Sequence, residues 1–395
     1  MRDFLNNQWQ KVRNYPVIVV FFALLIGFTL IDLIVPDRES SELENKNLAQ
    51  RPSFNLSTLL RNEWTAKYDQ YVKEQVFGRD TWITLYSRAE TALLRKTDIG
   101  GMTIGEDGQL FTKMPALTES EQKQLPKNIE AVTQFAARYP GKVTFMMAPS
   151  ASLVHADRLP YATPILDEGA LTDEIFAQVG QTANVLDLRP LFAEHREDDE
   201  ELYYFTDHHW TTYGAYLAYT AFCEQQGLTP FDPESHSAID VPKFYGTSYS
   251  ASRYYGTLPD TLTYYDLPNR MTVYEHNAMT NEFIDKGTTG LYDLAKLDTR
   301  DKYAAFLYGN NGYSVIEGDG KGSILVIKDS YANCFIPFLT ANYETIGVVD
   351  LRNFKSINAD ELIEQGGYDH VLVLYNFQSF KSDGFLVYLN RYAGK

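Results

Sequence analysis

The sequence has little of the chemistry on which small secreted scaffolds and zinc proteins depend. Only two of its 395 residues are cysteines, Cys223 and Cys334. Two thiols cannot build a disulfide framework, and neither lies in a pattern of thiolate metal ligands. We expect both to be buried free thiols, with a disulfide between them as the alternative.

Basic residues are also scarce. The chain has 35 Lys and Arg against 52 Asp and Glu, which gives a formal net charge of −17. Proteins that bind nucleic acid or anionic lipid need a basic surface, so this balance argues against both partners. A neutral or extended sugar polymer suits an acidic surface better. The 44% hydrophobic and 22% charged content is typical of a globular protein with a sizeable core.

A long apolar run, residues 16–35, predicts a transmembrane helix. It contains one charge, Asp32, near its end. Twenty residues rising about 1.5 Å each match a hydrocarbon core of ~30 Å. The run ends in Val35 and a proline, without the small residues of a cleavage site, so we expect an uncleaved anchor rather than a signal peptide.

The charges that flank this run set the expected orientation. Basic residues precede it and acidic residues follow, so residues 1–15 are predicted to be a cytoplasmic tail and the main domain extracytoplasmic. The protein would thus be a single-pass protein of the cell membrane. Residues 36–100 read as a linker and a helical stalk. Residues 101–395 form the main domain, with an insertion near 231–302 that is rich in Tyr, Thr, Ser and Asp.

The main domain alternates strand and helix signals, which predicts an α/β fold with a mainly parallel sheet. The pattern is clearest in the last third, where buried strands are expected at 322–327, 345–349 and 370–375 with helical segments between them. Ligands of such βαβ units bind at the carboxyl ends of the strands. Side chains that directly follow these strands are therefore the candidates for a site.

Asp207 and His209 form the first candidate pair. They follow an apolar run that looks like a strand, and residues two apart on an extended backbone point to the same side. A carboxylate beside a histidine fixes its tautomer and prepares it to deprotonate a nucleophile. His208 would then point away and is assigned to structure, or to a contact with the residues that surround the site, rather than to catalysis. The alternative is a surface loop pair, and a metal site is not expected because three adjacent residues rarely converge on one ion.

Ser330 is the candidate nucleophile. It follows the strand at 322–327 and precedes a predicted helix, so its hydroxyl would face the crevice while backbone N–H groups of the turn stabilise an oxyanion. The alternative is a helix cap. Asn376 follows the strand at 370–375, where its amide would donate a second oxyanion hydrogen bond. Its alternative is an Asx turn that closes the strand.

Two motifs carry a family resemblance. Thr206 to Trp210 reads Thr-Asp-His-His-Trp, and Ile327 to Asn333 reads Ile-Lys-Asp-Ser-Tyr-Ala-Asn. Both resemble the DHHW family of membrane-anchored envelope proteins. That family is similar to the SGNH-like domains of the alginate O-acetylation proteins and, more distantly, to the D-alanylation protein of teichoic acids. One departure is Lys328, at a position where many SGNH enzymes have glycine.

The resemblance implies an SGNH-hydrolase-like three-layer α/β/α sandwich in which Asp207, His209 and Ser330 match the triad. It also implies a membrane-anchored O-acyltransferase, with acetyl as the expected group, that acts on a cell-envelope polysaccharide or exopolysaccharide. A multipass membrane acyltransferase would be the partner that supplies the acyl group, and no cofactor or metal is expected. The alternatives are a carbohydrate esterase with the same triad, or a non-catalytic polysaccharide-binding scaffold of a synthesis complex.

Overall fold

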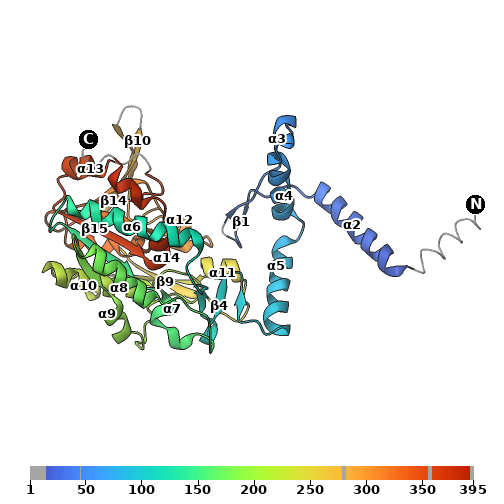
Figure 1. The fold of residues 1–395 in the computed structure, drawn as a ribbon, viewed down its shortest axis with the longest axis horizontal. Coiled ribbons are helices and arrows are strands. Elements are labelled where there is room, and N and C mark those ends of the chain that lie inside the picture. Colours follow the sequence, from blue (N-terminus) through green and yellow to red (C-terminus); the bar gives the residue numbers. More distant parts are fainter. Residues whose placement is uncertain (1–14, 45, 278–281, 355–357, 392–395) are drawn as a thin grey trace, which may run out of the picture. The chain divides into compact units, whose positions relative to one another are not determined.

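The computed structural model describes residues 15–44, 46–277, 282–354 and 358–391. The chain divides into two compact units, Met1–Leu93 and Leu94–Lys395 (Figure 1). The predicted cytoplasmic tail, residues 1–15, lies outside the described residues except for its last position.

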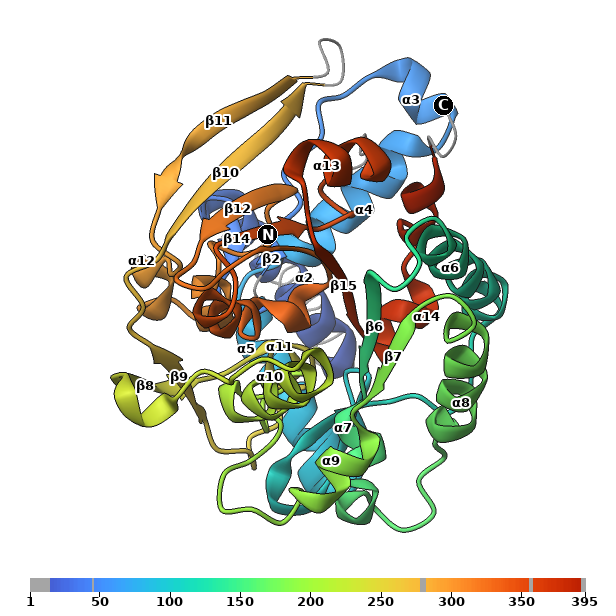
Figure 2. The ribbon, with the colours of Figure 1, turned by 90° about the vertical axis from the view of Figure 1, so that its left-hand side faces the viewer.

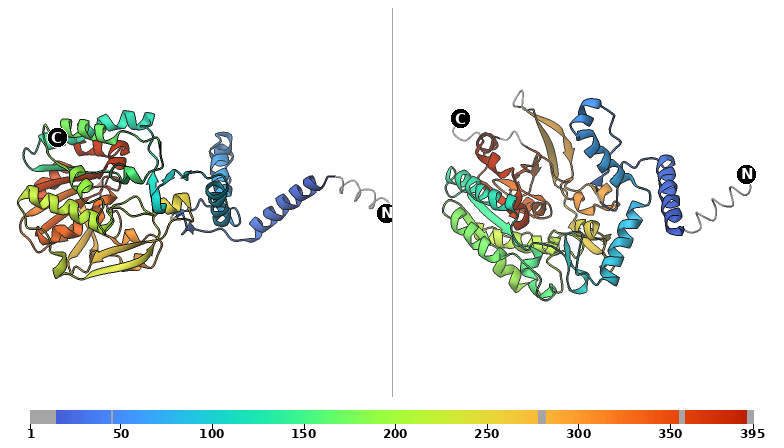
Figure 3. Two further views of the ribbon diagram at one scale, coloured as in Figure 1. Left: turned by 90° about the horizontal axis from the view of Figure 1, so that it is seen from below. Right: turned by 45° about the vertical axis from the view of Figure 1, so that its right-hand side comes forward.

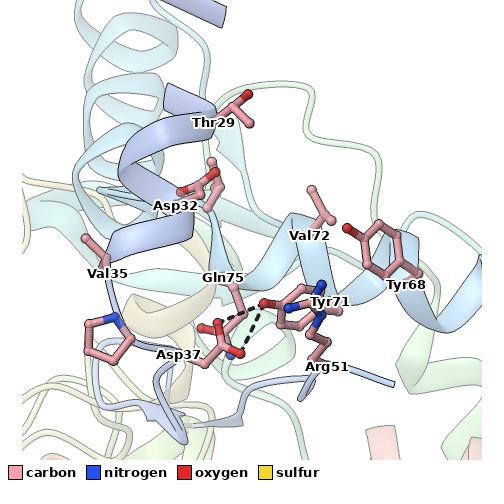
Figure 4. Close-up of a pocket in the computed structure, with 11 residues that line it drawn as sticks. Thr29, Asp32, Val35, Asp37, Arg51, Tyr68, Tyr71, Val72 and Gln75 are labelled. Atoms are coloured by element: carbon pink, nitrogen blue, oxygen red, sulfur yellow. Dashed lines mark hydrogen bonds between the residues drawn. The ribbon is translucent and has the colours of Figure 1, made fainter. Parts of the chain in front are cut away.

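The first unit is mainly helical. Its elements are α2 (Pro16–Ile34), β1 (Ser40–Ser41), β2 (Lys46–Asn47), α3 (Leu56–Leu60), α4 (Glu63–Gln75), α5 (Arg79–Arg88) and the π-helical turn η1 (Ala89–Leu93). Tyr71 of α4 donates its hydroxyl to the Asp37 carboxylate, at 2.9 Å from Oδ1 (Figure 4). Within the described residues, none of the helices combines the length and the apolar character needed to cross a bilayer. The span expected at residues 16–35 is therefore unconfirmed and stays a prediction.

The second unit is built on a mixed, largely parallel sheet of eight strands in the order β11-β10-β12-β14-β13-β15-β6-β7. Neighbours from β14 to β7 run parallel, and those from β11 to β14 run antiparallel. The α/β fold predicted from the sequence is thus confirmed. The strands are β6 (Val143–Ala148), β7 (Asn184–Asp187), β10 (Arg270–Asn277), β11 (Glu282–Thr289), β12 (Tyr313–Glu317), β13 (Ser323–Lys328), β14 (Thr345–Val349) and β15 (His370–Asn376).

Helical segments cover both faces of this sheet (Figures 2 and 3). Alternate side chains of β13 point to opposite sides, so that Ile324 packs in one core and Leu325 in the other. The Leu325 core includes side chains of α6 (Glu119–Ala137), α8 (Glu168–Val179), α13 (Ala359–Gly366) and α14 (Phe377–Ser382). The Ile324 core includes side chains of α10 (Thr212–Gln226) and of the 3₁₀ segments η6 (Ser330–Asn333) and η7 (Ile336–Ala341). Both faces of the parallel strands are thereby buried, as their continuous apolar runs require.

The segment expected to be an insertion, residues 231–302, has more regular structure than its sequence indicates. Its strands β10 and β11 extend the central sheet, and β8 (Ala238–Phe244) pairs antiparallel with β9 (Asp260–Tyr265). Between β8 and β9 lies α11 (Thr247–Ser252), and α12 (Leu294–Leu297) follows β11. Shorter elements of the unit include the strands β3 (Asp98–Ile99), β4 (Met102–Ile104) and β5 (Leu110–Thr112), and the helices α7 (Ala151–Val154) and α9 (Arg189–Glu194).

A buried carboxyl group holds the loop that follows β6. Glu168, at the first turn of α8, is 2% exposed, and its carboxylate accepts the backbone N–H and the hydroxyl of Ser150, at 2.8 and 2.5 Å. Burial raises the pKa of Glu168 to about 7. In the unfolded chain Glu168 is exposed, and an exposed Glu has a pKa of about 4.3. The unfolded chain therefore loses this proton at a lower pH than the folded protein does, so the folded state loses stability as the pH rises from about 4.3 to about 7.

We therefore expect a Glu168→Gln variant to lose less stability than the wild type when the pH rises from 5 to 8. The expected difference is roughly 3 kcal/mol, since one pKa unit corresponds to about 1.4 kcal/mol. Denaturant unfolding at both pH values measures it. Glu174→Gln, on the exposed side of the same helix, is the control and should fall as the wild type does. An equal fall in both variants would refute the assignment.

Candidate active site

The stretch from Tyr203 to Trp210 forms a tight loop. The structure corrects the predicted extended backbone here: Tyr203 and Trp210 pair as an isolated antiparallel bridge, and the residues between them turn back. Trp210 is fully buried and donates its indole N–H to the carbonyl of Tyr331, at 2.8 Å. This bond fastens the loop to the turn that carries Ser330.

Asp207, His209 and Ser330 are joined by a chain of hydrogen bonds. His209 Nδ1 lies 2.5 Å from Asp207 Oδ1, and His209 Nε2 lies 2.8 Å from Ser330 Oγ. Asp207 Oδ1 also accepts the backbone N–H of His209, at 3.0 Å, which is the contact of an Asx turn. The loop itself therefore sets the carboxylate beside the imidazole. The structure thus brings together two segments 121 residues apart in a nucleophile, base and orienter arrangement.

The Asp207 carboxylate is buried and held ionised. Burial alone would raise its pKa, but His209, His208 and hydrogen bonds from His209 and Thr247 hold the pKa of Asp207 well below its usual range. Asp207 Oδ2 accepts the backbone N–H and the hydroxyl of Thr247, at 2.7 and 2.8 Å. Gly246 makes this approach feasible, because a Cβ there would lie 2.2 Å from that of Asp207. Sequence reasoning missed Thr247, which lies in the segment without clear periodicity.

We expect Thr247→Val to slow the reaction of Ser330 with a serine-directed sulfonyl fluoride about tenfold or more. The variant keeps the backbone N–H but removes a hydroxyl that donates to a charged group, a bond worth roughly 1.5–3 kcal/mol. Thr247→Ser restores the hydroxyl and should react at the wild-type rate. The modification rate is measured by mass spectrometry. Equal rates for the Val and Ser variants would show that the hydroxyl does not support Asp207.

Ser330 lies directly after β13, as predicted, but the structure that follows is different. The helix predicted to follow Ser330 is replaced by the short 3₁₀ segments η6 and η7. Asp329, not Ser330, caps η6, by accepting the Tyr331 N–H at 2.9 Å. The cap alternative for Ser330 is therefore wrong. The Tyr331 N–H is thus occupied, whereas the Ser330 N–H has no hydrogen-bond acceptor among the described residues.

Asn376 is placed where predicted, at the end of β15, but its amide is occupied. Nδ2 donates to Asp329 Oδ2 at 2.7 Å and to Ser379 Oγ at 3.0 Å, while Oδ1 accepts the Ser379 N–H. Both amide protons are thus used, which corrects the expected role as an oxyanion donor. Asn376 caps α14 and holds Asp329 next to the nucleophile.

Two aromatic rings lie against His209. The His208 ring lies 3.9 Å from it, centroid to centroid, so the expectation that His208 points away is wrong. Burial lowers the pKa of His208 to about 4, which leaves this ring neutral at pH 7. Tyr303 stacks on His209 at 3.9 Å and 12°, and donates its hydroxyl to the carbonyl of Ser330 at 3.0 Å. Sequence reasoning missed Tyr303, because the sequence around it has no clear periodicity.

The same residues offer donor atoms close enough for a metal ion. One ligand atom from each of Asp207, His208 and His209 lies within 4.8 Å of the others. Both ring nitrogens of His209 are engaged, however, by Asp207 and by Ser330. A metal ion bound there would have to displace one of these hydrogen bonds. The donor set therefore fits proton transfer better than metal ligation.

Buried charges stiffen the strand ends beside the nucleophile. Lys328 Nζ donates to Asn310 Oδ1 at 2.7 Å and to Asn333 Oδ1 at 2.6 Å, and lies 3.5 Å from Asp350 Oδ2. Arg352 binds the same carboxylate with two N–H groups. Burial lowers the pKa of Lys328 to about 8. Lys328 is thus fixed in the core below the turn.

Cys334 lies just beyond this turn and Cys223 lies in α10. Both are buried free thiols, which confirms the expectation from the sequence.

The family resemblance is confirmed by a comparison with known families. The family described as DHHW protein matches residues 175–349, which contain the loop of Asp207 and His209 and the turn of Ser330. Over residues 175–349 the chain therefore matches the DHHW family. No curated protein matches it in sequence.

Two solved structures share the fold, and a third is a weaker match. A DHHW family protein from Eubacterium siraeum is 21% identical with a TM-score of 0.61, over 74% of this chain and 96% of that one. Bacillus cereus PatB1, solved with a sulfonyl adduct, is 17% identical with a TM-score of 0.57, over 71% of this chain and 96% of that one. The O-acetyltransferase domain of Pseudomonas putida AlgJ is 14% identical with a TM-score of 0.46, over 74% of this chain and 99% of that one.

Proposed function

We propose that this protein is a membrane-anchored, extracytoplasmic O-acyltransferase that acetylates a cell-envelope polysaccharide or exopolysaccharide. The observation that carries the proposal is the continuous chain of hydrogen bonds from Asp207 through His209 to Ser330 Oγ. This is the arrangement that activates a serine for acyl transfer. The DHHW family resemblance and the apolar run at residues 16–35 support the envelope setting.

In the proposed reaction Ser330 Oγ attacks the carbonyl carbon of an acyl donor while His209 Nε2 takes the hydroxyl proton. Asp207 stabilises the imidazolium that forms, and the Ser330 N–H donates to the oxyanion. Collapse of the tetrahedral intermediate breaks the bond to the leaving group, which takes the proton from His209. The acyl-serine then reacts with a sugar hydroxyl that His209 deprotonates, and Ser330 recovers its proton.

A partner is part of the proposal, because an extracytoplasmic enzyme meets no soluble activated acyl donor. A multipass membrane acyltransferase would pass the acyl group across the membrane to Ser330.

The sulfonyl adduct of PatB1, whose fold is similar, gives indirect support to the proposal that Ser330 is the nucleophile. Sulfonyl reagents trap activated serine hydroxyls, and the same reagents are therefore suitable probes of Ser330.

The test is a chromosomal Ser330→Ala replacement with the acetyl content of the envelope polysaccharides as the readout. We expect acetylation of one polymer to be lost while immunoblots show wild-type amounts of the protein. Ser382→Ala, an exposed serine at the end of α14, is the matched control and should leave acetylation intact. Unchanged acetylation in the Ser330→Ala strain would refute the proposal.

A further inference from the structure

The proposed chemistry leaves His208 without a task, although its ring lies 3.9 Å from that of His209, centroid to centroid. The two side chains differ in exposure. That of His208 is 31% exposed, whereas that of His209 is 6% exposed. His208 is therefore the imidazole of the pair that a molecule in solution can reach, and it lies directly beside the proposed base.

Hydrogen bonds determine which ring nitrogen of His208 carries the proton. The ionised Asp207 carboxylate can only accept, so the hydroxyl of Thr247 must donate its single proton to Asp207 Oδ2, at 2.8 Å. The same hydroxyl oxygen lies 2.6 Å from His208 Nδ1. Because its proton is already used, this oxygen can only accept from His208, which requires a proton on Nδ1.

The other nitrogen, His208 Nε2, is consequently a hydrogen-bond acceptor. Burial lowers the pKa of His208 to about 4, so at pH 7 the ring holds one proton, on Nδ1, and Nε2 carries a lone pair. No described residue donates to this nitrogen. It is also not among the buried polar atoms that lack a partner, in contrast to Nε2 of His155. His208 Nε2 is therefore accessible and can meet a ligand.

Two acceptors lie side by side once Ser330 is acylated. The acyl-serine has no hydroxyl proton, so His209 Nε2 loses its donor and becomes the acceptor for an incoming hydroxyl. His208 Nε2 is the second acceptor, on the neighbouring ring. Hydroxyls on adjacent carbons of a sugar are spaced on the same scale as two imidazole rings in contact. A molecule with two such hydroxyls can use both nitrogens, whereas an isolated hydroxyl can use only one.

We propose that His208 is an acceptor-binding residue that selects sugars with two neighbouring unmodified hydroxyls. His209 Nε2 would deprotonate one hydroxyl, which attacks the acyl-serine, while His208 Nε2 accepts a hydrogen bond from the next hydroxyl. The inference rests on the proposed function, because it concerns the acceptor of the same acyl-enzyme. It specifies a feature of the acceptor that the triad alone leaves open.

Competition between two alcohols for one acyl-enzyme tests this inference. The full chain is acetylated by a chromogenic acetyl ester in an equimolar mixture of cyclohexanol and a cis-cyclohexanediol with neighbouring hydroxyls. The two acetylated products are quantified by mass spectrometry. We expect the wild type to favour the diol about fivefold or more per hydroxyl, the size of effect that one neutral hydrogen bond gives. Both products come from the same acyl-enzyme, so any change in the acylation rate cancels from their ratio.

Variants of His208 separate binding from a structural role. His208→Asn removes Nε2 but keeps an N–H near the position of Nδ1, so the preference should fall to about twofold or less per hydroxyl. His208→Gln places an amide oxygen near the position of Nε2 and should restore part of the preference. His236→Asn, at an exposed histidine outside the site, is the matched control and should keep the wild-type ratio. A purely structural role would lower both products equally and leave the ratio unchanged.

Equal use of the two alcohols by the wild type, or the wild-type preference in His208→Asn, would overturn the inference. The proposed function is judged separately, by the acetyl content of the Ser330→Ala strain. Loss of acetylation in that strain without a preference for the diol in the purified protein would leave the proposed function standing and remove only the role of His208.

Discussion

An Asp207→Asn variant is expected to acylate Ser330 about 10⁴-fold more slowly than the wild type. Each oxygen of Asp207 accepts two donors, from His209 at Oδ1 and from Thr247 at Oδ2. An amide that turns its NH₂ group to His209 favours the wrong tautomer of that residue, and one that turns it to Thr247 meets the backbone N–H of Thr247. The substitution also removes the negative charge that stabilises the imidazolium.

The measurement is the pre-steady-state burst with a chromogenic acetyl ester. Asp298→Asn, an exposed aspartate after α12, is the matched control and should keep the wild-type burst rate. A burst within tenfold of the wild type for Asp207→Asn would mean that Asp207 does not act on His209, whatever their distance.

The second large effect concerns stability. Replacing Asp350 with Leu should destabilise the fold by about 3–5 kcal/mol, because it leaves Lys328 as an uncompensated buried charge. The side chains of Lys328 and Asp350 are 2% and 0% exposed. The loss should be smaller at pH 9 than at pH 6, since Lys328, whose pKa burial lowers to about 8, can then lose its proton.

Denaturant unfolding of the single variant and of Lys328→Met/Asp350→Leu measures this effect. The double variant removes both buried charges, so we expect it to regain most of the lost stability. Arg352, the other partner of Asp350, is one-third exposed and can be solvated. A single variant that loses less than about 1 kcal/mol would show that the ion pair does not hold the strand ends together.

The parallel core could be predicted from the sequence because continuous apolar runs leave little choice. The expected strands at 322–327, 345–349 and 370–375 correspond to β13 (Ser323–Lys328), β14 (Thr345–Val349) and β15 (His370–Asn376). The connection rule for parallel strands then places Ser330 at the carboxyl edge of the sheet. The position of Ser330 thus followed from local pattern and general topology.

The pairing of Asp207 with His209 was predicted for a different physical reason from the one observed. An extended backbone would have turned the two side chains to one side, whereas the structure uses an Asx turn that also brings His208 beside His209. Short polar stretches allow both conformations, and here the bridge between Tyr203 and Trp210 selects the turn. Local sequence does not contain that tertiary constraint.

Competition between acceptors explains the misassigned Asn376. The sequence places it at the right edge of the sheet, but Asp329, one residue before the nucleophile, takes one of its amide protons. Thr247 and Tyr303 were missed for another reason. They reach the triad from segments without helical or strand periodicity, and only the fold shows that they contact Asp207 and His209.

The central claim is that His209 and Asp207 activate Ser330 as a nucleophile, and covalent labelling tests it most directly. The full chain is treated with phenylmethylsulfonyl fluoride, and the modified peptide is mapped by mass spectrometry in the wild type and in His209→Ala. We predict a sulfonyl adduct on Ser330 in the wild type and its loss in the variant. No adduct on Ser330, or equal labelling of the two proteins, would contradict the account.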